Sequence, residues 1–146
     1  MNKLLLCLLL LVVVSSCGLT KDDDAVQQAR IADIIQRIMD AFNRNDEVDK
    51  IMSYYHRDFL HDGLNDDYAR HWWRGKRVEN SMIESVSGQR SIEIDGSYAR
   101  AVLVINFINL ENMQIPYPGY IMSYFYHERG EWKIYGNQKR GGERDE

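Results

Sequence analysis

The chain has 146 residues, of which 45% are hydrophobic, 11% aromatic and 27% charged. This is the composition and length of one globular domain, which excludes a fibrous, disordered or repeat protein and needs no disulfide to hold a core. Acidic residues outnumber basic ones by 22 to 18, so nucleic acid is a poor partner for this chain.

The first sixteen residues predict a secretory signal peptide. Lys3 is followed by an apolar run from Leu4 to Val14, which are the basic and hydrophobic regions of such a signal. A run of about 11 residues, at about 1.5 Å per residue, is too short to cross a hydrocarbon core of about 30 Å. We therefore expect residues 1–16 to be removed rather than to stay as a membrane-spanning helix.

The segment Val14-Ser15-Ser16-Cys17 resembles a bacterial lipobox. The resemblance implies that Cys17 carries lipid as the first residue of the mature protein, and that two or three acyl chains anchor it to the membrane. Residues 17–24 then form a lipidated tether, and Gly18 implies the periplasmic face of the outer membrane within the cell envelope. With Cys7 removed and Cys17 acylated, no thiol remains for a disulfide or a metal.

Three helices are expected in the first half of the domain. Residues 25–44 repeat apolar side chains at three- and four-residue steps, which predicts a long amphipathic helix capped by Asp24. Asp46 is expected to cap a shorter helix ending near Tyr55. After a turn at residues 61–63, a third helix is predicted from Asn65 or Asp66 to about Arg77.

Strands are expected after residue 78. Residues 81–86 and 91–95 are predicted to be extended, and residues 98–108 to form one long strand. Residues 110–118 are predicted to be a loop. The five alternate residues of the long strand form an apolar face: Ala99, Ala101, Leu103, Ile105 and Phe107.

The end of the chain predicts a hairpin. Residues 120–128 and 131–138 alternate in polarity on either side of Arg129-Gly130, a turn signal, and residues 139–146 form a flexible polar tail. Trp132 is expected to pack on the long helix near Ile35 or Phe42. Helices followed by strands predict an α+β fold, with three N-terminal helices packed on a curved antiparallel sheet of four or more strands.

This order of elements is similar to the nuclear transport factor 2-like (SnoaL-like) superfamily, the cone fold of ketosteroid isomerases, polyketide cyclases and many binding proteins. The resemblance covers residues 25–138. It implies a central pocket in the cone, and a homodimer formed through the sheet face away from the helices. The fragments that carry it are residues 51–55, 58–63, 72–73, 94–99 and 130–136, and the implied dimer face is Arg100, Val102, Val104, Asn106, Phe125 and Tyr135.

Aromatic side chains are the candidates for lining such a pocket, where they would hold a small apolar ligand. Packing of the same side chains into the core is the alternative that the sequence leaves open. The candidates are Tyr55, Phe59, Trp72, Trp73, Phe107 and Tyr124.

Steroid-isomerase relatives use a sheet carboxylate as the base, but residues 98–108 and 120–126 contain no Asp or Glu. Asp58 and His61 are the remaining candidates for acid–base catalysis, so the catalytic residues stay unassigned. The four histidines have no metal-ligand spacing, and we expect no metal and no cofactor. The sequence thus predicts an exported, lipid-anchored, non-catalytic domain that binds a small apolar ligand or an envelope protein. The alternative is a small-molecule isomerase, cyclase or dehydratase.

Overall fold

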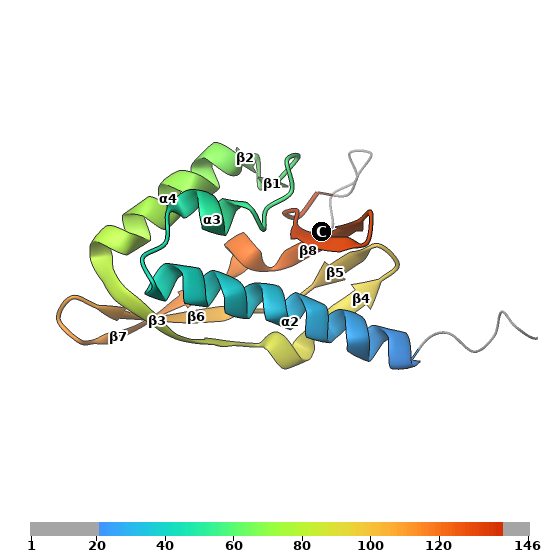
Figure 1. Ribbon diagram of the computed structural model, residues 1–146, viewed down its shortest axis with the longest axis horizontal. Helices are drawn as coiled ribbons and strands as arrows, with labels where there is room; N and C mark the ends of the chain where they lie inside the picture. The colour runs from blue at the N-terminus through green and yellow to red at the C-terminus, as the bar shows by residue number, and fades with distance from the viewer. Residues whose placement is uncertain (1–20, 139–146) are drawn as a thin grey trace, which may run out of the picture.

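The computed structural model describes residues 21–138, so the predicted signal peptide, Cys17 and the predicted tail at 139–146 lie outside the described residues (Figure 1). No helix within 21–138 has the length and apolar character that crossing a bilayer requires. The helical segments are α2 (Lys21–Asn43), α3 (Val48–Met52) and α4 (Asp66–Glu79), with short 3₁₀ turns η1 (Gln89–Ser91) and η2 (Tyr120–Met122).

All named strands pair in antiparallel fashion, in two sheets of order β3-β6-β7 and β4-β5-β8-β9 and one small hairpin, β1-β2. Figure 1 shows α2 lying across the sheets, with α3 and α4 on the same side. The predicted α+β class is confirmed. The strands are β1 (Leu60–His61), β2 (Leu64–Asn65), β3 (Asn80–Ser87), β4 (Glu93–Asp95), β5 (Tyr98–Arg100), β6 (Val104–Asn109), β7 (Gln114–Pro118), β8 (Tyr124–Glu128) and β9 (Glu131–Ile134).

Helix α2 begins earlier than the sequence predicts. It starts at Lys21, so Asp24 lies inside its first turn rather than at its cap, and the last four residues of the predicted tether are helical. Its core-facing side chains recur at three- and four-residue steps, as an amphipathic helix requires. They are Ile31, Ile35, Ile38, Ala41 and Phe42, all at most 3% exposed.

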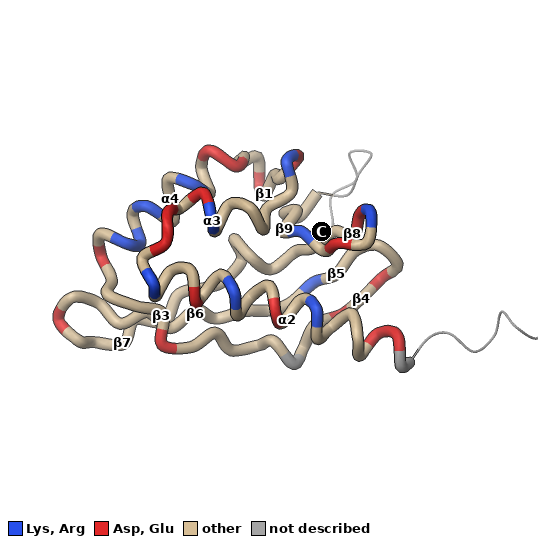
Figure 2. The backbone as a smooth tube through the Cα atoms, viewed as in Figure 1, with Lys and Arg blue, Asp and Glu red and all other residues tan. Residues whose placement is uncertain are grey.

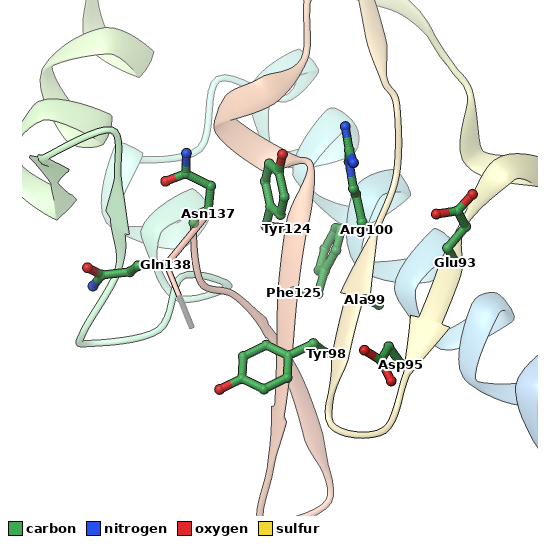
Figure 3. Close-up of a pocket in the computed structure, with 10 residues that line it drawn as sticks. Glu93, Asp95, Tyr98, Ala99, Arg100, Tyr124, Phe125, Asn137 and Gln138 are labelled. Carbon is green, nitrogen blue, oxygen red and sulfur yellow. The ribbon is translucent and has the colours of Figure 1, made fainter. Parts of the chain in front are cut away.

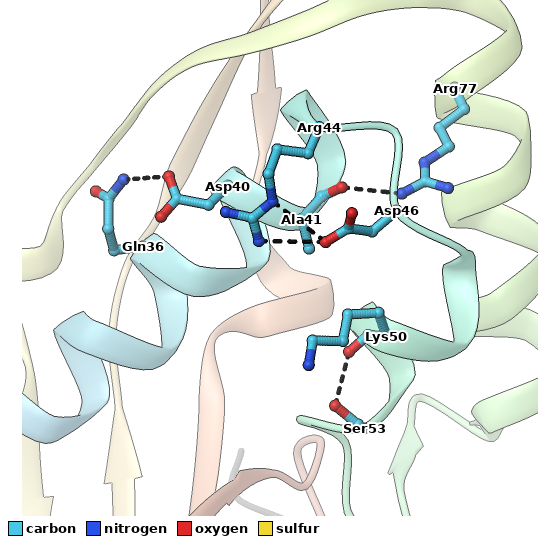
Figure 4. A network of polar contacts seen from close by, with 8 residues as sticks. All are labelled: Gln36, Asp40, Ala41, Arg44, Asp46, Lys50, Ser53 and Arg77. Atoms are coloured by element: carbon cyan, nitrogen blue, oxygen red, sulfur yellow. Dashed lines mark hydrogen bonds and ion pairs between the residues drawn. The ribbon is translucent and has the colours of Figure 1, made fainter.

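Side-chain hydrogen bonds fix the C-terminal end of α2 to neighbouring elements. The Arg77 Nη2 atom donates to the Ala41 carbonyl at 3.3 Å (Figure 4), which places a cation at the negative end of the helix dipole. Asn43 holds the backbone of Ile83 with two hydrogen bonds, at 2.8 and 2.7 Å. The end of α2 is thereby docked onto both α4 and β3.

The second helix is shorter than predicted, and the third begins as predicted. Helix α3 follows Glu47 rather than Asp46 and ends at Met52. Asn65 caps α4 by accepting from the Tyr68 amide at 3.3 Å.

The predicted turn at residues 61–63 closes the β1–β2 hairpin. The two central residues, Asp62 and Gly63, have φ of 49° and 80°. Positive φ at both positions is the backbone geometry that matches the twist of a two-residue hairpin.

The prediction of one strand over 98–108 is wrong, because the chain bends between β5 and β6. At the bend, the Ala101 amide donates to the Ser123 carbonyl and the Gly119 amide to the Leu103 carbonyl, each at 2.8 Å. Glycines on neighbouring segments leave room for the bend: a Cβ on Gly88 would lie 1.9 Å from the Val102 oxygen. The predicted apolar face nevertheless survives, since all five of its residues are at most 5% exposed.

Three further predictions for the second half are wrong. Residues 114–118, predicted as loop, form β7, whose two prolines are tolerated because β7 is an edge strand. The segment predicted as a strand from residue 120 begins instead with η2. Strand β9 also ends at Ile134 rather than near Gln138.

Trp132 packs on α2 as predicted, but at a different level of the helix. It is 4% exposed, and its Nε1 atom donates to the Gln27 Oε1 atom at 2.8 Å. The contact therefore lies in the N-terminal half of α2 rather than near Ile35 or Phe42.

The implied dimer face needs correction at two positions. Phe125 and Tyr135 are 1% and 4% exposed and are unavailable to a partner, whereas Val102 and Val104 are 67% and 36% exposed. Strands β6 and β7 carry no charged residue (Figure 2). Pairing of two copies stays a prediction.

The bend at residues 101–103 can be tested by comparing two glycines of similar backbone conformation. Gly88 and Gly130 have φ of 90° and 84°, but a Cβ meets backbone atoms only at Gly88. Gly130→Ala should cost the left-handed backbone penalty of about 1–2 kcal/mol. Gly88→Ala should cost about 1–3 kcal/mol more, because Val102 must move. Urea unfolding measures both, and equal losses would mean that Gly88 does not set the bend.

Candidate functional site

The interior of the cone is occupied by the aromatic side chains that the sequence offered as a pocket. Trp73 Nε1 donates to the Tyr55 hydroxyl at 2.9 Å, and that hydroxyl donates to the Ile121 carbonyl at 3.1 Å. Both bonds are buried, and burial raises the pKa of Tyr55, so the phenol stays protonated and able to donate. Tyr55 is therefore a structural link rather than a group poised for proton transfer.

Ring contacts fill the space around this link. Phe42 packs on Trp73 and Phe107 at centroid distances of 5.9 and 5.5 Å, and Tyr55 packs edge-on to Phe59 at 5.0 Å. The structure thus favours the core-packing alternative over the apolar pocket for five of the six candidates. These are Tyr55, Phe59, Trp72, Trp73 and Phe107, each at most 9% exposed.

The two candidate acid–base residues do not form a shared site. Asp58 is an exposed side chain whose backbone amide donates to the His56 Nδ1 atom at 3.0 Å. This bond makes Nδ1 the acceptor, so His56 carries its proton on Nε2, which lies 3.2 Å from the Glu128 Oε2 atom. Asp58 therefore belongs to the turn after α3 and faces solvent.

His61 is the more unusual of the two. It is 8% exposed and stacks on Tyr120, with ring centroids 5.8 Å apart and planes within 7°. Its Nδ1 atom is buried and has no hydrogen-bond partner among the described residues. Burial lowers the pKa of His61, although the Asp62 carboxylate at 3.6 Å opposes the shift. His61 is therefore held as a neutral imidazole between aromatic rings.

The sixth pocket candidate, Tyr124, lies in a groove on the opposite side of the sheet from the core. Pairing of β4, β5 and β8 places Glu93, Arg100 and Tyr124 side by side on that face. The groove has a volume of about 220 Å³. Its floor is the backbone around Ala99 and Phe125, and its other lining residues are Asp95, Tyr98, Gly136, Asn137 and Gln138 (Figure 3).

Figure 3 shows how the lining side chains are arranged. Tyr124 and Arg100 extend together on one side of the groove, and Tyr98 lies on the other. The guanidinium of Arg100 lies over the Tyr124 ring, 5.6 Å from its centroid. Asn137 and Gln138 lie at one end, and the carboxylates of Glu93 and Asp95 lie at the other. The groove therefore combines two aromatic walls with a polar group at each end.

Several contacts hold the groove residues in place. Tyr98 packs on Tyr126 at 5.0 Å and on Tyr135 at 6.2 Å. Asn137 and Asp62 make two hydrogen bonds, at 2.9 and 2.6 Å. Gly136 allows the chain to pass close to β1, since a Cβ there would lie 2.1 Å from the Leu60 oxygen. The walls and one polar end are thus ordered before any ligand binds.

A second hollow, of about 410 Å³, lies beside His56 and the β8–β9 turn. Its polar side chains are largely paired with one another or with backbone. Lys133, for example, contacts the Glu131 carboxylate at 3.3 Å and the Ser53 carbonyl at 3.0 Å. The groove is the stronger candidate, because among the described residues Glu93 and Asp95 make no ion pair there.

No protein-family model matches the chain, and no curated protein matches it in sequence. Solved structures do match its fold. A Mycobacterium tuberculosis protein of unknown function shares 16% identity over 83% of this chain and 74% of its own, at a TM-score of 0.54. A Nostoc punctiforme protein of unknown function with a cystatin-like fold shares 11% over 77% and 88%, also at 0.54. An NTF2 design shares 15% over 80% and 96%, at 0.51.

These identities show the fold alone, which is the cystatin-like, NTF2-like cone. The fold implied by the family resemblance is confirmed. Sequence reasoning missed Tyr98 and Asn137 and assigned Arg100 to the implied dimer face, because the groove is assembled from three strands and a segment after β9. The one signal available was the concentration of tyrosines on residues 117–126 and 135.

Protonation of His61 should make stability depend on pH. Because the folded pKa is lowered below the ordinary value of about 6.5, the unfolded chain binds the proton more readily. The free energy of unfolding should be highest above about pH 6.5. It should decrease as the pH is lowered from there toward the lowered pKa of His61. His61→Gln should flatten this fall in urea unfolding measured at several pH values. His71→Gln, at an exposed position, should leave it unchanged, and a wild-type slope in His61→Gln would refute the assignment.

Proposed function

We propose that this protein is a lipid-anchored module of the bacterial cell envelope that acts by binding rather than by catalysis. The observation that carries the proposal is the filled cone. The side chains that would surround a substrate contact one another instead, around the Trp73–Tyr55 hydrogen bond. Binding is then assigned to the groove between Tyr98 and Tyr124 on the outer face of the sheet.

Support for the anchor comes from the sequence. The short basic and apolar segment ends in Val14-Ser15-Ser16-Cys17, which lies outside the described residues. Helix α2 begins at Lys21, so only three residues separate Cys17 from the folded domain. A lipid on Cys17 would therefore hold the domain close to the membrane surface.

The buried environment of His61 favours the alternative function, which is that of an isomerase, cyclase or dehydratase. A buried imidazole with a lowered pKa and an unpaired Nδ1 atom has the properties of a general base. The carboxylate nearest to it, Asp62, is already bonded to Asn137 at 2.6 Å. Within residues 21–138, the carboxylate beside His61 is therefore already engaged and is not free to complete a proton transfer.

Lipidation is tested by exchanging the two cysteines separately. Cys17→Ala should abolish incorporation of labelled palmitate and should leave the longer precursor, because the acceptor sulfur is gone. Cys7→Ala removes a thiol inside the apolar segment and should leave labelling and processing intact. Palmitate incorporation into Cys17→Ala would show that the lipobox interpretation is wrong.

Binding and catalysis are separated by variants of the groove and of His61. Native mass spectrometry of the full chain, extracted in detergent from its own membrane, should detect a retained molecule that Arg100→Ala loses. Asp58→Asn should retain it, since that side chain faces solvent and does not line the groove. Turnover of a small keto or hydroxy compound that falls about 10²–10⁴-fold in His61→Gln would instead establish the enzyme.

A further inference from the structure

The groove on the outer sheet face has a mixed chemistry that restricts what it can bind. A wholly apolar ligand would bury the amide of Gln138, and the N–H of Asn137 that does not bond Asp62, without replacing their bonds to water, which costs free energy for each unpaired group. A strongly anionic ligand would approach two carboxylates, Glu93 and Asp95, for the single cation Arg100. The residues therefore favour an uncharged ligand that offers both apolar surface and many hydrogen-bonding groups.

A saccharide has this combination. Each hydroxyl both donates and accepts a hydrogen bond. Gln138 offers one amide donor group and one acceptor, and Asn137, whose Oδ1 and Nδ2 atoms bond Asp62, keeps one further N–H. Carboxylates accept from neighbouring hydroxyls, and the planar guanidinium of Arg100 donates from several N–H groups. The C–H face of a sugar ring packs against an aromatic ring, and Tyr98 and Tyr124 offer two.

The volume of the groove and the fixed positions of its aromatic walls agree with a saccharide ligand. A volume of about 220 Å³ is below the range of about 300–1,000 Å³ for drug-sized ligands, and it suits a single sugar ring. Arg100 is held against Tyr124, and Tyr98 against Tyr126, so the two walls need little reordering on binding.

We propose that the groove between Tyr98 and Tyr124 binds one ring of a neutral saccharide. This rests on the proposed function only in taking the domain as a binding module. In the proposed complex the ring lies between Tyr98 on one side and Tyr124 with Arg100 on the other, with Asn137 and Gln138 at one end and Glu93 and Asp95 at the other. Residues from β4, β5, β8 and the segment after β9 thereby form one site.

The test uses the ¹⁵N-labelled full chain in a detergent without a sugar headgroup, titrated with N,N′-diacetylchitobiose and with maltose. We expect saturable amide shifts confined to the groove with at least one disaccharide, at a dissociation constant on the order of 1 mM. Arg100→Ala and Tyr98→Ala should each weaken binding by about tenfold, equivalent to about 1.4 kcal/mol. Tyr98→Phe keeps the ring and should bind within about twofold of wild type.

Tyr68→Ala is the matched control, because Tyr68 is an exposed tyrosine on α4 outside the groove, and it should bind like wild type. Arg100 is exposed, so Arg100→Ala tests the site even if Tyr98→Ala fails to fold. Groove shifts absent with both disaccharides, or unchanged affinity in Arg100→Ala, would overturn the proposal. Tighter binding of glucose 6-phosphate than of either disaccharide would overturn it as well.

Two further measurements distinguish a glycan chain from a free sugar as the source of the bound ring. Co-sedimentation with insoluble chitin, together with weaker binding of N-acetylglucosamine than of its dimer, supports a glycan chain. Equal binding of monomer and dimer supports a free sugar. Failure of sugar binding leaves palmitate labelling of Cys17 untouched, whereas loss of labelling leaves the groove untouched, so the two proposals fail separately.

Discussion

The buried hydroxyl of Tyr55 joins three parts of the chain that meet inside the cone. It accepts from Trp73 of α4 at 2.9 Å and donates to the Ile121 carbonyl of η2 at 3.1 Å. A buried polar group without its partner costs about 1–3 kcal/mol, so an indole N–H and a carbonyl both depend on this oxygen. The relative positions of α4, η2 and the segment after α3 follow from that requirement.

The filled interior of the cone restricts where a ligand can bind. Trp72, Phe42 and Phe107 complete the packing around Trp73, and protein interiors packed to this extent do not admit a ligand without rearrangement. The groove on the opposite side of the sheet is therefore a stronger candidate site than the interior of the cone. The fold is shared with the Mycobacterium tuberculosis and Nostoc punctiforme proteins, but a fold hosts many functions and the site must carry the argument.

The predictable features depend on local sequence. Asn65 caps α4 and Asp62-Gly63 closes a hairpin because both devices act within three or four residues. The break in the predicted strand at 101–103 depends on Gly88 and Gly119, which approach it from other segments. The alternation of apolar and other residues over 98–108 does not reveal these contacts, because it continues unchanged through the bend. The groove was missed for the same reason, since Arg100 and Tyr124 become neighbours only through the pairing of β5 and β8.

The bend and the groove are connected through the same strand. Alternation along β5 places Tyr98 and Arg100 on the outer face, and beyond the end of β5 the side chains of Ala101 and Leu103 lie in the core. Asp62 acts from the other direction, because its bonds to Asn137 hold the segment after β9 against the β1–β2 hairpin. His61, the neighbour of Asp62, stacks on Tyr120 and contacts Tyr124, a wall of the groove. His61, which the sequence offered for catalysis, thus packs against one wall of the groove.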